Sequence, residues 1–116
     1  MMGLTAFFGI GLLAFQGPQQ QQRNLKVLPQ NISRDSLDHL MDEYKIDLGV
    51  KCGYCHAQGS KASDANPKKD IARTMMRMTD DMNHKYMALV PHSDTAQVQT
   101  VTCYTCHRGL PKPVLK

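Results

Sequence analysis

Two short cysteine motifs constrain this chain more than any other feature. The segments CGYCH, starting at Cys52, and CYTCH, starting at Cys103, share the pattern CxxCH and contain all four cysteines of the 116-residue chain. On one helical turn, two cysteines three positions apart reach two vinyl groups on the same porphyrin edge, and the next histidine can bind iron from below the ring. CxxCH is therefore the attachment signature of c-type haem. The sequence predicts two covalently bound haem c groups, attached at Cys52, Cys55, Cys103 and Cys106, with His56 and His107 as iron ligands.

Other uses of paired cysteines agree less well with the sequence. Two CxxC knuckles of a structural zinc site are usually separated by ~15–20 residues, whereas these pairs begin about 50 residues apart. Neither zinc nor a pair of disulfides in an exported protein needs the two histidines. Thioredoxin-like CxxC chemistry requires a βαβ context, and no segment of this chain predicts a strand convincingly.

The N-terminal part of the chain differs from the rest. Residues 3–15 form an almost unbroken apolar run, too short to span a bilayer as a helix and typical of a signal peptide core. We predict that residues 1–17 are a signal peptide or an N-terminal membrane anchor. The protein would then work in the periplasm or on the outer face of the inner membrane. Residues 18–23 are predicted to be a polar, Gln-rich linker, and residues 24–116 a dihaem cytochrome c domain.

A helix is predicted before the first motif. Ser33 is a favourable N-cap, and Gly49 is suited to end the helix in a left-handed conformation. Between them, an apolar stripe at helical spacing contains Leu37, Leu40, Met41, Tyr44 and Leu48. Met41 lies on this stripe, 11 residues before Cys52, and is the candidate for the sixth ligand of the first iron.

A second helix is predicted before the second motif. Asn66 and Pro67 indicate its start, an apolar stripe runs from Ile71 to Leu89 over about six turns, and Pro91 ends it. The expected fold is all-α with little or no sheet: two helix–turn–CxxCH units packed around two haems. Met ligands for the second iron are available at Met75, Met76, Met78, Met82 and Met87, and the stripe favours Met75, Met78 or Met82.

The segments from Asn24 to the first motif, and ARTMMRMTDDMN with VTCYTCHRG, resemble the cytochrome c subunit of photosynthetic reaction centres. The resemblance covers about residues 24–110. It implies Met41 as the sixth ligand of the first iron. In the family pattern M-x-x-M-T-x-x-x-N the first Met is the sixth ligand of the second iron, and that position is Met75 here. Met78, Thr79 and Asn83 occupy the supporting positions of the pattern.

The chain also departs from this family. The family subunit binds four haems in two such halves, and this chain has one half. Leu89 occupies the position aligned with a bis-His ligand of the family, so we interpret both irons as His/Met-ligated. His39, His84 and His92 are expected on solvated surfaces, with His92 as the alternative ligand. Tyr54 and Tyr104 are expected at the porphyrin edges, and Arg108 either pairs with a propionate or is solvated.

The sequence predicts an electron carrier and not an enzyme, because two six-coordinate irons leave no open position for substrate. The alternative is a dihaem peroxidase or gas sensor with one five-coordinate haem. The expected partners are redox proteins, such as a membrane-bound respiratory or photosynthetic complex, with membrane association through residues 1–17. The net charge of +4 suits an acidic partner or an anionic membrane as well as it suits ordinary solubility. The sequence has no basic stripe with interleaved aromatic residues, which is the pattern that would indicate binding of single-stranded nucleic acid.

Overall fold

The computed structural model describes residues 23–90 and 100–114. These two ranges contain three α-helices: α1 (Arg34–Leu48), α2 (Lys68–Asp81) and α3 (Cys103–His107). The only strand-like pairing among the described residues is an isolated bridge between Ala57 and Ser60, so the expected helical fold is confirmed. The predicted leader, most of the Gln-rich linker, Pro91 and His92 lie outside the described residues. No helix in the described ranges is long and apolar enough to cross a membrane.

Helix α1 begins and ends as the sequence predicts. The Ser33 hydroxyl accepts a hydrogen bond from the Ser36 N–H at 3.0 Å, which satisfies one free donor of the first turn. At the other end Gly49 has φ 60° and ψ 35°. The Gly49 N–H donates to the Ile46 carbonyl and the Val50 N–H donates to the Lys45 carbonyl. These two bonds form a Schellman motif, which requires a left-handed residue at Gly49.

The second helical segment is less regular than its stripe predicts. Asn66 Oδ1 accepts from the Lys68 N–H at 3.1 Å, so the predicted start is confirmed. The α-helical part ends at Asp81. It is followed by a π-helical turn, η2 (Met82–Tyr86), and a 3₁₀ turn, η3 (Met87–Leu89). The prediction of one α-helix of about six turns was therefore wrong for the last third, where Asn83 bonds another segment of the chain.

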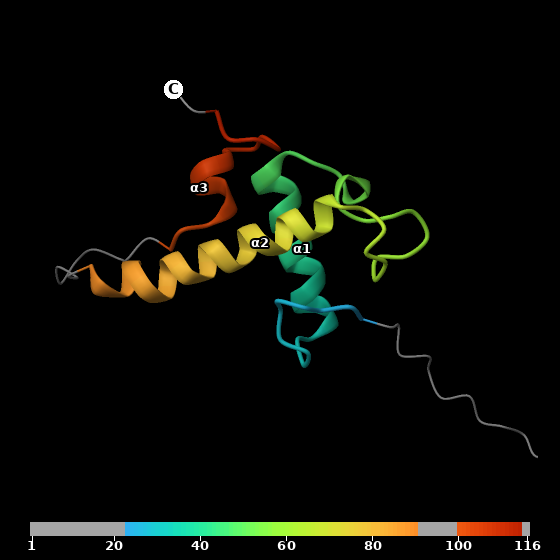
Figure 1. The fold of residues 1–116 in the computed structure, drawn as a ribbon, viewed down its shortest axis with the longest axis horizontal. Helices are drawn as coiled ribbons and strands as arrows, with labels where there is room; N and C mark the ends of the chain where they lie inside the picture. Colours follow the sequence, from blue (N-terminus) through green and yellow to red (C-terminus); the bar gives the residue numbers. More distant parts are fainter. Residues whose placement is uncertain (1–22, 91–99, 115–116) are drawn as a thin grey trace, which may run out of the picture.

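Asn83 links the end of α2 to the segment that precedes the second motif. Its side-chain Nδ2 donates to the Val101 carbonyl at 2.9 Å, and its Oδ1 accepts from the Val101 N–H at 2.8 Å. A single side chain thus satisfies both backbone groups of one residue, as a neighbouring strand would. This contact holds the start of the second CxxCH segment beside α2 (Figure 1).

Helix α3 packs against both longer helices, and in Figure 1 it lies beside the end of α1 and above α2. Its junction with α1 is made largely by backbone and by Asp47. The Asp47 carbonyl accepts from the Gly109 N–H at 2.9 Å, and Asp47 Oδ2 accepts from the Tyr104 N–H at 3.1 Å. A Cβ at Gly49 would lie only 2.0 Å from the Gly109 carbonyl oxygen, so the junction requires glycine there.

The described residues contain no buried apolar side chain. Ile46, Ile71 and Leu89 are 70%, 60% and 79% exposed, although apolar burial is the main source of stability in a folded domain. The two buried side chains are instead the charged residues Lys69 and Arg73. The helices alone therefore form no hydrophobic core within the described ranges.

A polar cluster surrounds these two residues. Asp64 lies 3.2 Å from Lys69 Nζ, 2.9 Å from Arg73 Nη1 and 2.6 Å from Lys26 Nζ. Arg73 also pairs with Asp70 at 2.7 Å. The cluster connects the segment that precedes α1, which contains Lys26, with the loop after the first motif and the first turns of α2.

Candidate haem-attachment sites

The first CxxCH motif begins on a 3₁₀ turn, η1 (Cys52–Tyr54), and continues into a turn with Cys55 and His56. The Cys55 N–H and the His56 N–H both donate to the Cys52 carbonyl, at 3.3 and 2.9 Å. Cys52 is exposed and Cys55 is half-buried. Burial raises the pKa of the Cys55 thiol.

The second motif forms helix α3 itself. At its start the Thr102 N–H donates to Thr105 Oγ1 at 3.0 Å, and the Thr105 N–H donates to the Thr102 carbonyl at 3.2 Å. Here too one cysteine, Cys103, is half-buried and the other, Cys106, is exposed. Burial, assisted by the carboxylate of Asp47, raises the pKa of the Cys103 thiol.

The two motif histidines have the same hydrogen-bond arrangement. His56 Nδ1 lies 3.0 Å from the Lys61 carbonyl oxygen, and His107 Nδ1 lies 2.9 Å from the Leu110 carbonyl oxygen. A carbonyl oxygen can only accept, so Nδ1 is the donor in both rings, and in the neutral form of each ring Nε2 keeps its lone pair. Burial lowers the pKa of His56, as do the nearby Lys69, Lys61 and Arg73 cations. A neutral imidazole with a free Nε2 is the form that binds a metal ion.

The turn after α3 positions the acceptor for His107. Arg108 has φ 50° and Gly109 has φ 79°, and these successive left-handed residues reverse the chain. The Leu110 N–H then donates to the His107 carbonyl at 2.9 Å. The reversal brings the Leu110 carbonyl to the imidazole, so His107 and its hydrogen-bond acceptor lie within four consecutive residues.

The two methionines assigned by resemblance lie on different long helices. Met41 is half-buried on α1, whereas Met75 is 36% exposed and Met78 43% exposed on α2. Thr79, one of the supporting positions, donates its hydroxyl to the carbonyls of Met76 at 2.9 Å and Met75 at 3.2 Å. It thereby contacts the backbone of the assigned ligand.

The remaining histidines within the described ranges lie at the surface, as expected. The side chains of His39 and His84 are both 76% exposed and lie near Glu43 and Asp80 respectively, at 3.6 and 3.1 Å. His84 Nδ1 also lies 3.0 Å from the Asp80 carbonyl oxygen. Unlike the contacts of the motif histidines, this one joins two residues of the same exposed helical turn. His92 lies outside the described residues.

The tyrosines inside the motifs have separate surroundings. Tyr54 lies beneath Lys68, whose Nζ is 3.7 Å from the ring centroid. Tyr104 is 52% exposed. Their position at a porphyrin edge stays a prediction. The Arg108 side chain is exposed, and its pairing with a propionate stays a prediction as well.

Sequence reasoning missed two residues that build these sites. Asp47 supports the start of α3 from the last turn of α1, where the helix dipole disfavours a carboxylate; that local conflict was the available signal. Lys69 donates to the carbonyls of Lys61, Ala62 and Ser63 at 2.9, 3.0 and 2.9 Å. Nothing in its sequence context distinguishes Lys69 from the neighbouring Lys68.

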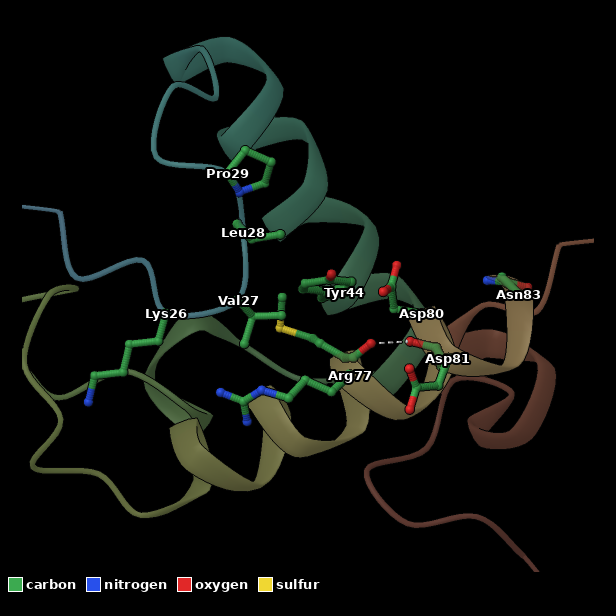
Figure 2. Close-up of a pocket in the computed structure, with 11 residues that line it drawn as sticks. Lys26, Val27, Leu28, Pro29, Tyr44, Arg77, Asp80, Asp81 and Asn83 are labelled. Atoms are coloured by element: carbon green, nitrogen blue, oxygen red, sulfur yellow. Dashed lines mark hydrogen bonds between the residues drawn. The ribbon is translucent and has the colours of Figure 1, made fainter. Parts of the chain in front are cut away.

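A separate open pocket of about 620 Å³ lies between the N-terminal segment, α1 and α2. Figure 2 shows Lys26 and Arg77 toward one side of it and Asp80 and Asp81 toward the other, with Tyr44 between the helices. None of the four cysteines lines it. Elsewhere, no group of three or more His, Cys, Asp or Glu side chains in the described part of the chain is arranged to hold a metal ion, so the four cysteines do not come together as a zinc cluster.

Comparison with known proteins agrees with the motifs. The family model of the photosynthetic reaction centre cytochrome C subunit matches residues 15–115. Cytochrome c-554 of Chloroflexus aurantiacus is 41% identical over 64 residues, which are 55% of this chain and 15% of that protein. The photosynthetic reaction center cytochrome c subunits of Thermochromatium tepidum and Rubrivivax gelatinosus are 40% and 39% identical over 62 residues, 53% of this chain and 14% and 15% of theirs.

The matched stretch is thus only about one seventh of the length of these curated relatives. No solved structure matches the chain. The family model nevertheless covers nearly all of the chain, including both CxxCH motifs and both long helices. The chain belongs to the photosynthetic reaction centre cytochrome c subunit family.

Proposed function

We propose that this chain is a dihaem c-type cytochrome that transfers single electrons between redox partners. In this proposal Cys52 and Cys55 attach one haem and Cys103 and Cys106 attach the other. His56 with Met41, and His107 with Met75, are the axial ligands of the two irons. The observation that carries the proposal is the repeated hydrogen bond from the motif histidine Nδ1 to a backbone carbonyl, which leaves Nε2 available at both motifs.

The residues present fit a haem c group. Thiols three positions apart, a neutral imidazole and a thioether form the donor set that c-type haem uses. The exposed apolar side chains on α1 and α2 are of the kind that pack against a porphyrin, and a bound porphyrin would bury them. Haem iron supplies reversible one-electron chemistry when bound. The chain contributes attachment, orientation of the imidazoles through Lys61 and Leu110, and control of solvent access.

A Met/His ligand pair is expected to raise the reduction potential relative to two histidines. With both irons saturated, the protein would have no open position for substrate, which favours electron transfer over a peroxidase or a gas sensor. We further propose that the chain is exported, works in the periplasm or on the outer face of the inner membrane, and exchanges electrons with a membrane-bound respiratory or photosynthetic complex. Relatives named as reaction centre subunits support this class of partner.

The experiment is to express the full chain with the periplasmic cytochrome c maturation machinery and measure haem content and carbon monoxide binding. We expect two haems per chain, and a reduced spectrum that does not change with the gas. Met41→Ala and Met75→Ala should each allow carbon monoxide to bind half of the haem. Met76→Ala is the matched control on the same helix and should bind none.

The other outcomes are informative. Carbon monoxide binding to half of the wild-type haem would overturn the saturated model and favour a peroxidase or gas sensor. Carbon monoxide binding to the Met78→Ala variant, with none to the Met75→Ala variant, would show that Met78 is the sixth ligand of the second iron. An exported, full-length protein without covalent haem would refute the proposal.

A further inference from the structure

One carbonyl group connects the first motif histidine to a buried cation. The Lys61 carbonyl oxygen accepts from His56 Nδ1 at 3.0 Å and from Lys69 Nζ at 2.9 Å. Lys69 is only 9% exposed, so water screens its charge poorly. The ammonium and the imidazole therefore share one acceptor, which has two lone pairs.

The second motif histidine has a different environment. His107 Nδ1 bonds the Leu110 carbonyl at 2.9 Å. Among the described residues, no lysine or arginine side chain donates a hydrogen bond to that carbonyl. The two sites thus use the same imidazole arrangement, but only the first is coupled to a buried charge.

We propose that Lys69 is a positioning residue that raises the reduction potential of the haem at His56 relative to the haem at His107. This inference rests on the proposed haem attachment. An ammonium bonded to the Lys61 oxygen polarises that carbonyl and weakens it as an acceptor for the His56 Nδ1–H. The imidazole then donates less electron density to the iron, which raises the reduction potential. Hydrogen-bond partners of the ring nitrogen that does not bind the metal are known to tune a metal site through this effect. A buried positive charge also disfavours the more positive oxidised iron.

The surrounding carboxylate provides a second prediction of opposite sign. Asp64 lies 3.2 Å from Lys69 Nζ and 2.9 Å from Arg73 Nη1, and it partly neutralises both cations. Asp64→Asn keeps the side-chain shape and removes the negative charge, so it should raise the potential of the first haem. Lys69→Gln keeps a hydrogen-bond donor and removes the positive charge, so it should lower that potential.

Lys26 offers a matched control for charge alone. Its Nζ contacts Asp64 Oδ2 at 2.6 Å, its side chain is 51% exposed, and it does not bond the Lys61 carbonyl. Lys26→Gln removes one positive charge from the same cluster without changing the acceptor of His56. Its effect on the potential should therefore be less than half that of Lys69→Gln.

The test is a spectroelectrochemical redox titration of the full-length holoprotein, with the second-site haem identified by carbon monoxide binding in a Met75→Ala background. For Lys69→Gln we expect the ratio of reduced to oxidised first haem, at a given potential, to fall threefold to tenfold. For a one-electron couple this is about 28 to 59 mV. The second haem should shift by less than threefold.

The outcomes separate this inference from the proposed function. Variants that contain two haems but show no shift at the first haem, equal shifts at both haems, or as large a shift for Lys26→Gln would refute the role of Lys69. If Lys69→Gln does not fold, Asp64→Asn still tests the inference, and a lowered or unchanged first-haem potential would overturn it. A wild-type protein without covalent haem would instead refute the proposed function.

Discussion

Replacing Gly49 by alanine should disrupt the junction between α1 and α3. A Cβ at this position would lie 2.0 Å from the Gly109 carbonyl oxygen and 2.9 Å from its carbon, and both atoms belong to the backbone and cannot rotate away. The left-handed conformation at Gly49, φ 60°, costs a residue with a Cβ a further ~1–2 kcal/mol. The two segments must therefore separate or distort.

The size of the effect follows from the bonds at the junction. Separation would break the bond from the Gly109 N–H to the Asp47 carbonyl, worth ~0.5–1.5 kcal/mol, and the bond from the Tyr104 N–H to the Asp47 carboxylate, worth ~1.5–3 kcal/mol. Together with the conformational strain, we expect the free energy of unfolding to fall by roughly 3–6 kcal/mol. The measurement is urea denaturation of the holoprotein, followed by far-ultraviolet circular dichroism.

Gly59→Ala is the matched control. Gly59 has φ 80°, and a Cβ there meets nothing within 4 Å, so it should cost only the ~1–2 kcal/mol of left-handed strain. A loss for Gly49→Ala no greater than that for Gly59→Ala would show that the close approach to Gly109 does not limit the fold.

Three further predictions concern other contacts. Asn83→Ala leaves both backbone groups of Val101 without their partner and should destabilise the holoprotein by about 1–3 kcal/mol in the same denaturation assay; an unchanged midpoint would contradict this. The pKa of Asp64 lies well below its usual range, chiefly through its hydrogen bond from Lys26. Its stabilisation is therefore fully present above the unfolded pKa of ~3.9 and is lost progressively as pH falls from there through the lower pKa of the folded state. In acid denaturation, Asp64→Asn should differ from wild type at neutral pH, and the difference should begin to shrink below about pH 4 and continue to shrink as pH falls further; a constant difference would refute this. Burial raises the pKa of Tyr44 to about 12, so the free energy of unfolding should fall above pH ~10, where the phenol ionises in the unfolded chain but not in the folded one. Tyr44→Phe should remove a phenolate absorbance transition near pH 12. A transition that persists in this variant would show that it belongs to another residue.

The elements that the sequence predicts best are those with local causes. Ser33 and Gly49 determine the ends of α1 through contacts within a few residues, and both ends lie where the sequence places them. The start of α2 at Asn66 is local as well. These features depend on propensity and capping, which are properties of short segments.

The features that the sequence does not predict depend on distant contacts. Helical periodicity is the same whether a helix continues or widens into a π turn, and Asn83 is held by Val101, 18 residues away. The role of Asp47 depends on Tyr104, 57 residues away. Lys69 and Lys68 are adjacent and chemically identical, and only the course of the loop over residues 61–63 buries one of them.

The arrangement around Lys69 also has a consequence for how this loop responds to its surroundings. Three successive carbonyl oxygens converge on one ammonium, much as loop carbonyls converge on a bound calcium ion. Here the cation is part of the chain, so it cannot be removed by a chelator or diluted away. The order of this loop should therefore be independent of the concentration of divalent ions in the surrounding solution.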